Sequence, residues 1–200
     1  PLAYLLDDSQ LKAKVIRYVN WTLNNQRPSG YFGPITKQER EKGIEITPDN
    51  CAAGEDWWPK MIMLKVLKQH YEATNDPRVI PFMRKFFAYQ AAALDNCPLG
   101  KWTEWAASRG TDNALLTLWL YSKTKDKKLL DLAAKNESQS FRWSEWLGNR
   151  DWVMWPPPNE TGELWMRRHA VNIGMALKAP AINYVRTSDP EYLKALKTGW

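Results

Sequence analysis

Apolar residues recur along this chain with the period of a helix. Between residues 11 and 26, for example, Val15, Ile16, Val19 and Leu23 fall on one stripe, as expected for an amphipathic helix. No segment alternates polar and apolar residues over more than a few positions, so the sequence predicts no strand. The pattern predicts an all-α protein with helices at about 11–26, 56–72, 77–94, 111–122, 127–140, from 165 onward with a kink at Pro180, and from 190 onward.

A short phrase recurs where one predicted helix ends and the next begins. It consists of Tyr, two residues, Thr, one residue and Asp, at 71–76, 121–126 and 184–189, with a shorter copy near 4–9. Asp is a favoured N-cap because its carboxylate accepts from the free N–H groups of the first turn. Pro77 and Pro190 follow two of these Asp residues and suit a first helical position. Such repetition predicts stacked helical hairpins.

The helices on the two sides of each phrase differ. Those before it are apolar on most sides, and those after it are amphipathic. A helix that is apolar all round is buried on all sides, so we expect an inner ring of helices wrapped by an outer ring, which is an α/α toroid. The alternative is an open α-solenoid, with shorter and more even connections. Residues 1–200 are expected to form a single segment of one toroid domain, truncated at both ends.

Composition narrows the classes of function. The chain has 12 tryptophans, and Trp serves both in cores and as an amphipathic platform for other rings, including sugars. The net charge is +6, but Lys and Arg are scattered and no nucleic-acid-binding motif occurs, so no nucleic acid is expected as a partner. No apolar run is long enough for a membrane span. Cys51 and Cys97 are too few for a disulfide framework and lack a zinc-ligand spacing. The compartment stays open, with a secreted or periplasmic one favoured.

Unusual residues gather at the starts of the predicted inner helices, which all lie at one end of a toroid. Long loops precede these starts, whereas the turns at the opposite end are short, and this contrast indicates a pocket at the loop end. Of the two histidines, His70 lies among lysines and is expected to be a solvated surface residue, whereas His169 is a candidate. The candidate binding residues are Glu55, Asp56, Trp57, Trp58, Trp105, Arg109, Asp112, His169 and Asn172.

Each candidate also has a structural interpretation. Asp56 and Asp112 suit helix N-caps, and Glu55 suits the positive end of a helix. Arg109 could pair with Asp112, His169 could be a packed core residue, and the tryptophans fit a core as well as a platform.

Taken together, the candidate residue types favour a carbohydrate site. Trp faces can stack on the C–H surfaces of sugars, while Asp, Asn, Arg and His bind hydroxyl groups. Glycoside hydrolysis usually needs two carboxylates that flank the scissile bond. The sequence offers several near these helix starts without indicating which two face each other: Glu55, Asp56, Glu104, Asp112 and Glu163.

Several of these stretches resemble one known family. Gly54-Glu-Asp-Trp-Trp-Pro with the phrase at 71–80, Arg109-Gly-Thr-Asp-Asn with its flanking residues, and His169-Ala-Val-Asn with the residues up to 184 are similar to the β-L-arabinofuranosidase-like glycoside hydrolases, family 127 and its relatives. The similarity extends over essentially the whole chain. It implies an (α/α)6 barrel, of which this chain is the middle part, and a contact of His169 with the sugar in the −1 subsite.

The resemblance also implies an activity and its limits. The family uses a cysteine nucleophile, a zinc bound by Cys and Glu, and a Glu acid/base, which lie C-terminal to the matching region, so neither Cys51 nor Cys97 corresponds to them. We therefore expect a fragment of a glycoside hydrolase acting on L-arabinofuranosyl-type or related plant glycans. The segment alone is expected to be inactive and without a cofactor, with zinc in the full-length protein. The alternatives are a non-catalytic carbohydrate-binding or scaffold protein and a sugar epimerase or lyase on the same barrel.

Overall fold

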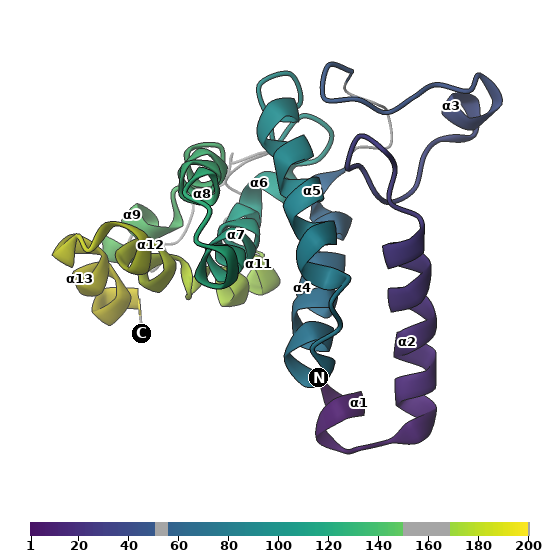
Figure 1. Ribbon diagram of the computed structural model, residues 1–200. Helices are drawn as coiled ribbons and strands as arrows, with labels where there is room; N and C mark the ends of the chain where they lie inside the picture. Colours follow the sequence, from purple (N-terminus) through teal and green to yellow (C-terminus); the bar gives the residue numbers. More distant parts are fainter. Residues whose placement is uncertain (51–55, 150–168, 200) are drawn as a thin grey trace. The chain divides into compact units, whose positions relative to one another are not determined.

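The computed structural model describes residues 1–50, 56–149 and 169–199, and its regular elements in these ranges are all helices. The predicted all-α class is therefore confirmed. The chain forms two compact units, Pro1–Cys97 and Pro98–Trp200, each of which is a separate set of packed helices (Figure 1). In the described residues, no helix is long and apolar enough to cross a membrane.

The first unit is built around one long helical hairpin, α4 and α5. Its helices are α1 (Leu2–Leu5), α2 (Ser9–Asn24), α3 (Lys37–Glu41), α4 (Trp57–Thr74) and α5 (Val79–Ala93). The side chain of Asp8 caps α2 by accepting from two backbone N–H groups at 2.9 Å each. The short α3 lies between the predicted helices at 11–26 and 56–72, where the sequence predicted a long loop. It begins with a capping box in which Thr36 and Glu39 bond to each other's backbone N–H groups.

An aromatic core holds the hairpin to the preceding loop. The ring of Phe32 lies 5.1 Å from that of Phe82 and 4.9 Å from that of Phe86, and Tyr31 meets Tyr89 edge-on at 5.8 Å. Gly30 allows this approach because its φ is +101° and a Cβ there would lie 2.4 Å from a backbone carbonyl of α5. The loop after α2 is thus part of the core rather than a mobile surface segment.

The second unit contains the remaining helices. They are α6 (Glu104–Ser108), α7 (Gly110–Thr124), α8 (Lys128–Ser138), α9 (Trp143–Gly148), α11 (Ala170–Ala176), α12 (Ala179–Thr187) and α13 (Pro190–Gly199). One part of its core joins Trp143, Trp146 and Leu147 of α9 to Ala176 and Ala179. The expected interruption near Pro180 is confirmed: the helix breaks at residues 177–178, and Pro180 lies in the first turn of α12.

The three Tyr-x-x-Thr-x-Asp phrases fold into one repeated turn, called here the Thr–Asp turn. In each, the Thr hydroxyl donates to the carbonyl four residues earlier, at 2.8, 3.0 and 2.8 Å. The Asp carboxylate then accepts from the backbone N–H two residues later, at 3.0, 3.1 and 3.0 Å. Asp189 directly precedes α13, as predicted for an N-cap, whereas the N-cap residues of α5 and α8 are Arg78 and Lys127, so that Asp76 and Asp126 lie one or two residues further out than predicted. The residue between Thr and Asp adopts a left-handed conformation each time: Asn75, Lys125 and Ser188.

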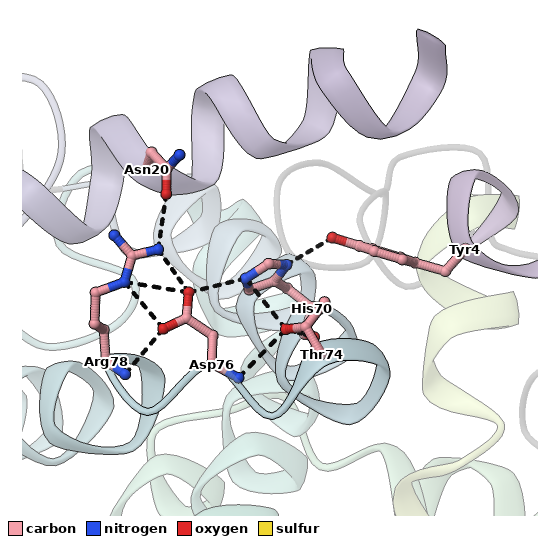
Figure 2. Close-up of polar contacts among 6 residues, drawn as sticks. All are labelled: Tyr4, Asn20, His70, Thr74, Asp76 and Arg78. Carbon is pink, nitrogen blue, oxygen red and sulfur yellow. Dashed lines mark hydrogen bonds and ion pairs between the residues drawn. The ribbon is translucent and has the colours of Figure 1, made fainter. Parts of the chain in front are cut away.

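The first Thr–Asp turn carries an additional polar network, which overturns one expectation (Figure 2). His70 is buried rather than solvated. Its Nδ1 lies 2.6 Å from the Tyr4 hydroxyl and its Nε2 lies 3.1 Å from Asp76 Oδ2. Because a carboxylate can only accept, the Nε2 that faces Asp76 carries a proton. Arg78 completes the network by donating to both oxygens of Asp76, at 2.9 and 2.6 Å, and to Asn20 of α2 at 2.7 Å.

Candidate functional site

The candidate site of the second unit forms where three helices begin. Trp105 lies in α6, Arg109 and Asp112 lie at the start of α7, and His169 and Asn172 lie at the start of α11. We call these five residues, with Lys178, the Arg109 cluster. The structure brings Trp105, Arg109, His169 and Asn172 into a chain of direct contacts, so residues more than 60 positions apart converge as the sequence predicted.

Arg109 is the centre of the cluster. It occupies the single position between α6 and α7 and is 6% exposed. Its Nε donates to Asn172 Oδ1 at 3.0 Å, and its guanidinium lies 4.8 Å from the centre of the Trp105 ring. Burial lowers the pKa of Arg109 from its ordinary value, and the nearby charge of Asp112 opposes this shift. The hydrogen bond to Asn172 and the contact with Trp105 together fix the plane of the guanidinium.

Close packing beneath Arg109 explains why the chain can turn there. Gly110 follows it, and a Cβ at this position would lie 1.7 Å from Ser140 Oγ and 2.9 Å from a methyl group of Leu99. The backbone of α7 can approach the end of α8 so closely only because no side chain intervenes. Nearby, Trp143 Nε1 donates to the Ser108 carbonyl at 2.7 Å, which ties α9 to the same corner.

Trp105 and His169 form the aromatic side of the cluster. Their ring centres lie 5.2 Å apart and their planes are nearly perpendicular, at 85°. His169 occupies the N-cap position of α11, but its side chain does not cap the helix. Both residues are half-buried. The sequence left open whether His169 is a packed core residue, and its intermediate exposure beside a Trp ring is compatible with contact to a ligand.

Asp112 is not a simple N-cap, and its ion-pair partner is one that sequence reasoning missed. It is 1% exposed, and its Oδ1 lies 2.9 Å from Nζ of Lys178. The sequence had left open a pair with Arg109, on which the charge of Asp112 also acts. Lys178 is at the break between α11 and α12, two residues before Pro180. That proline was the available signal, because a helix interruption presents a side chain that a continuous helix would place elsewhere.

The remaining candidates belong to the first unit, at the start of α4. Asp56 is the N-cap, and its carboxylate accepts from the Trp58 backbone N–H at 3.0 Å. Trp57 is 1% exposed, and its Nε1 donates to the Cys97 carbonyl at 2.9 Å. Its faces are packed in the core, so it offers no stacking platform, whereas Trp58 is half-buried. Glu55 lies outside the described residues.

Lys60 is an unexpected buried cation in the same region. It is 2% exposed, and its Nζ lies 4.7 Å from the centre of the Tyr31 ring and 5.7 Å from that of Trp57. Nζ also donates to the Asp56 carbonyl at 3.2 Å. Aromatic faces attract a desolvated cation, so Lys60 fastens the loop at Tyr31 to the first turn of α4. In the sequence, only the nearby aromatic residues Trp57 and Trp58 could have suggested that Lys60 is buried.

The chemistry of the Arg109 cluster suits binding better than bond cleavage. It offers a guanidinium, an amide, an imidazole and an indole, which together recognise hydroxyl groups and C–H faces. Its carboxylate, Asp112, is already paired with Lys178, so the cluster lacks the two flanking carboxylates of glycoside hydrolysis. Within the described ranges, no group of three His, Cys, Asp or Glu side chains could hold a metal ion. Cys97 is buried and disulfide-bonded.

Comparison with known proteins gives one match. A family model described as Beta-L-arabinofuranosidase, GH127 catalytic domain, matches residues 2–200. The matched range includes every residue of the Arg109 cluster and all three Thr–Asp turns. No curated protein and no solved structure matches the chain.

Proposed function

Because the chain belongs to the family of β-L-arabinofuranosidase catalytic domains of glycoside hydrolase family 127, we propose that the Arg109 cluster binds an L-arabinofuranosyl or closely related plant-type sugar. Family membership places the chain in a glycoside hydrolase domain of the all-α toroid class, whose substrate is a carbohydrate. The single observation that supports sugar binding by the Arg109 cluster is the series of contacts from Asn172 through Arg109 and Trp105 to His169.

Each residue in this series of contacts has a definite role in the proposal. Asn172 is fully buried and holds Arg109 by accepting from its Nε. Trp105 lies against the guanidinium and holds its plane, and we assign to this held guanidinium the recognition of a sugar hydroxyl. His169 supplies a second hydrogen-bonding group beside the indole. Rigid support of this kind lowers the entropic cost of binding.

The ion pair between Asp112 and Lys178 has a positioning role. It joins the first turn of α7 to the residue that precedes α12. It therefore fixes the distance between the helix that carries Arg109 and the chain segment that follows Asn172. The proposal assigns no catalytic role to Asp112, because a carboxylate paired with a lysine and almost fully buried is neither free nor accessible enough to attack.

This assignment separates sugar binding from bond cleavage. We propose that the chain supplies sugar recognition and that bond cleavage depends on residues outside it, with zinc bound elsewhere in the full-length protein. The chain by itself should then bind sugar without hydrolysing glycosides. Catalytic acids and nucleophiles need a geometry that brings them to the scissile bond, and the cluster offers only groups that hold a substrate.

The test is an assay of the full-length protein on aryl β-L-arabinofuranosides and pectic oligosaccharides. Arg109→Lys should lower kcat/KM at least about tenfold, because lysine cannot both donate to Asn172 and keep a planar group on Trp105. Arg17→Lys, at an exposed position of α2, is the matched control and should leave kcat/KM unchanged. Circular dichroism of both variants checks that they fold.

Two results would contradict the proposal in different ways. If a folded full-length protein turns over none of these glycosides, the assigned activity is wrong, and a non-catalytic carbohydrate-binding protein takes its place. If it turns them over and Arg109→Lys matches the wild type, the activity stands but the Arg109 cluster is not the sugar site. An isomerised or unsaturated sugar, detected by NMR of the products, would identify an epimerase or a lyase instead.

A further inference from the structure

The second unit contains a polar cavity that the proposed function does not use. It has a volume of about 320 Å³ and is lined by residues of α7, α8, α9, α12 and α13. We call it the Glu137 pocket. A smaller cavity of about 190 Å³ adjoins it, and the two share Ser144, Glu145 and Tyr192. These volumes are at the lower end of small-ligand sites, and they suit one or two sugar rings.

The polar side of the pocket is held in place by its own contacts. Arg186 Nη2 lies 2.5 Å from one carboxylate oxygen of Glu137. The amide of Asn183 donates to the other oxygen, and also to Ser144 Oγ at 3.0 Å. These residues come from three different helices, α8, α12 and α9. The carboxylate and the guanidinium are therefore fixed before a ligand arrives, while each keeps acceptor or donor capacity for further hydrogen bonds.

Tyr192 gives the pocket an aromatic wall with a polar edge. Its hydroxyl makes no hydrogen bond within the ranges that the structure describes, although the residue is largely covered. Burial, followed by the charge of Glu137, raises the pKa of Tyr192, so the hydroxyl stays protonated and can both donate and accept. A phenol ring with a hydroxyl to spare, beside a fixed carboxylate, matches the alternation of C–H faces and hydroxyls on a sugar.

The charges around the pocket select the class of ligand. Two arginines, Arg142 and Arg186, face two glutamates, Glu137 and Glu145, and each arginine is paired with one glutamate. The lining therefore has no net charge with which to attract a phosphate, a carboxylate or a cation. What it offers is a dense set of donors and acceptors next to aromatic surface, which favours a neutral, hydroxyl-rich molecule.

The pocket is distinct from the Arg109 cluster in its residues. Thr111 and Ala179 line the pocket, whereas their neighbours Asp112 and Lys178 form the ion pair of the cluster. The same two helix starts, of α7 and α12, thus contribute to both sites through different side chains. We propose that the Glu137 pocket is a second, non-catalytic binding site for a neutral sugar residue. This inference does not depend on the proposed hydrolytic function.

The experiment measures binding of D-galactose, L-arabinose and D-xylose to the full chain by saturation-transfer difference NMR. We expect saturable binding with a dissociation constant on the order of 1 mM, as suits a ligand of this size. Tyr192→Phe keeps the ring and removes the hydroxyl, and should weaken this binding about fivefold, the usual effect of one hydrogen bond. Tyr192→Ala should abolish binding at the Glu137 pocket and leave binding at the Arg109 cluster in place. Tyr18→Ala, at an exposed tyrosine of α2, is the matched control and should leave binding unchanged.

Further arms separate this site from the Arg109 cluster and test its preference for a neutral ligand. His169→Ala should leave the Tyr192-dependent binding intact, whatever happens to hydrolysis by the full-length protein. D-Galacturonate should bind no more tightly than D-galactose. The inference is overturned if none of the three sugars binds, if both Tyr192 variants bind like the wild type, if His169→Ala removes all binding, or if galacturonate binds tenfold more tightly than galactose.

Discussion

The two ends of the helical hairpins follow opposite rules. At one end, the three Thr–Asp turns repeat the same hydrogen bonds to within 0.2 Å. At the other end, each helix starts differently: Asp56 caps α4, Arg109 separates α6 from α7, and His169 precedes α11 without capping it. A turn whose hydrogen bonds join only neighbouring residues can recur along the chain whatever packs against it. A helix start whose side chains contact distant residues cannot recur in this way, and the candidate binding residues lie at such starts.

The largest expected effect tests the packing of a helix start. Gly110→Ala should lower the free energy of unfolding by about 3 kcal/mol, because the new Cβ would overlap Ser140 and Leu99 in a packed corner. Gly174→Ala is the matched control, since nothing lies within 4 Å of a Cβ in that helix, and it should be neutral or stabilising by up to about 1 kcal/mol. Urea denaturation measures both. Equal effects would show that the corner is not tightly packed.

The next effect tests whether the three turns are energetically alike. Asp76→Ala should cost about 2–3 kcal/mol, since it removes the acceptor of the Arg78 backbone N–H and leaves the Arg78 and His70 side chains without their shared acceptor. Asp189→Ala removes only the corresponding cap and should cost about 1 kcal/mol. Chemical denaturation at neutral pH compares the two. If the costs are equal, the network of the first turn adds nothing to stability.

Low pH should remove the stability that Asp76 contributes. The hydrogen bond from Arg78 holds the pKa of Asp76 well below its usual range, against the opposing effect of burial. A carboxylate with a lowered pKa in the folded state stabilises the protein above its unfolded pKa of about 4. That contribution is lost as the pH falls through the folded pKa. The gap in stability between wild type and Asp76→Ala should therefore be constant from about pH 5 to 7 and should shrink below pH 4.

A smaller effect distinguishes buried from exposed ion pairs. Lys178→Met should cost about 2 kcal/mol, because it leaves the almost fully buried Asp112 without its cationic partner. Lys194→Met breaks an exposed pair with Glu191 whose atoms are 3.5 Å apart, and it should change stability by less than about 0.5 kcal/mol. Thermal unfolding of the two variants provides the comparison. A negligible cost for Lys178→Met would remove its positioning role.

The smallest effect is a gain in stability. Lys125 occupies the left-handed position of the second Thr–Asp turn, with φ of 59°, where side chains with a Cβ are strained. Lys125→Gly should therefore raise the free energy of unfolding by up to about 1 kcal/mol. The control is Lys127→Gly at the N-terminal side of α8, where φ is −62° and glycine should be neutral or destabilising. Loss of stability in Lys125→Gly would contradict the assigned strain.

Local features of the fold could be predicted from sequence, and long-range ones could not. The bounds of α4, α5, α7 and α8 agree with the predicted helices within about two residues, because apolar stripes and Asp caps act within one or two turns. The short α3 was missed although Thr36 and Glu39 have the spacing of a capping box. Ile62, expected inside an apolar helix, is 39% exposed, so composition alone did not determine which side of α4 is covered.

The candidate site divides in the same way. The residue types and their convergence in the second unit were predicted, since Arg109 and His169 each stand at a helix start. The partner of Asp112 was not, because Lys178 reaches it only through the break before α12. His70 was misplaced because its burial depends on Tyr4, 66 residues earlier. No local pattern carries that information.

The polar network at the first turn has a consequence for the order in which the chain folds. The Thr–Asp turns join residues at most four apart, so their closure costs little chain entropy and can occur early. The bonds from Tyr4 to His70 and from Asn20 to Arg78 span 66 and 58 residues. They can form only after the α4–α5 hairpin presents both partners. The first two helices should therefore dock last and detach first, which makes α1 and α2 the earliest sites of hydrogen exchange as the protein opens.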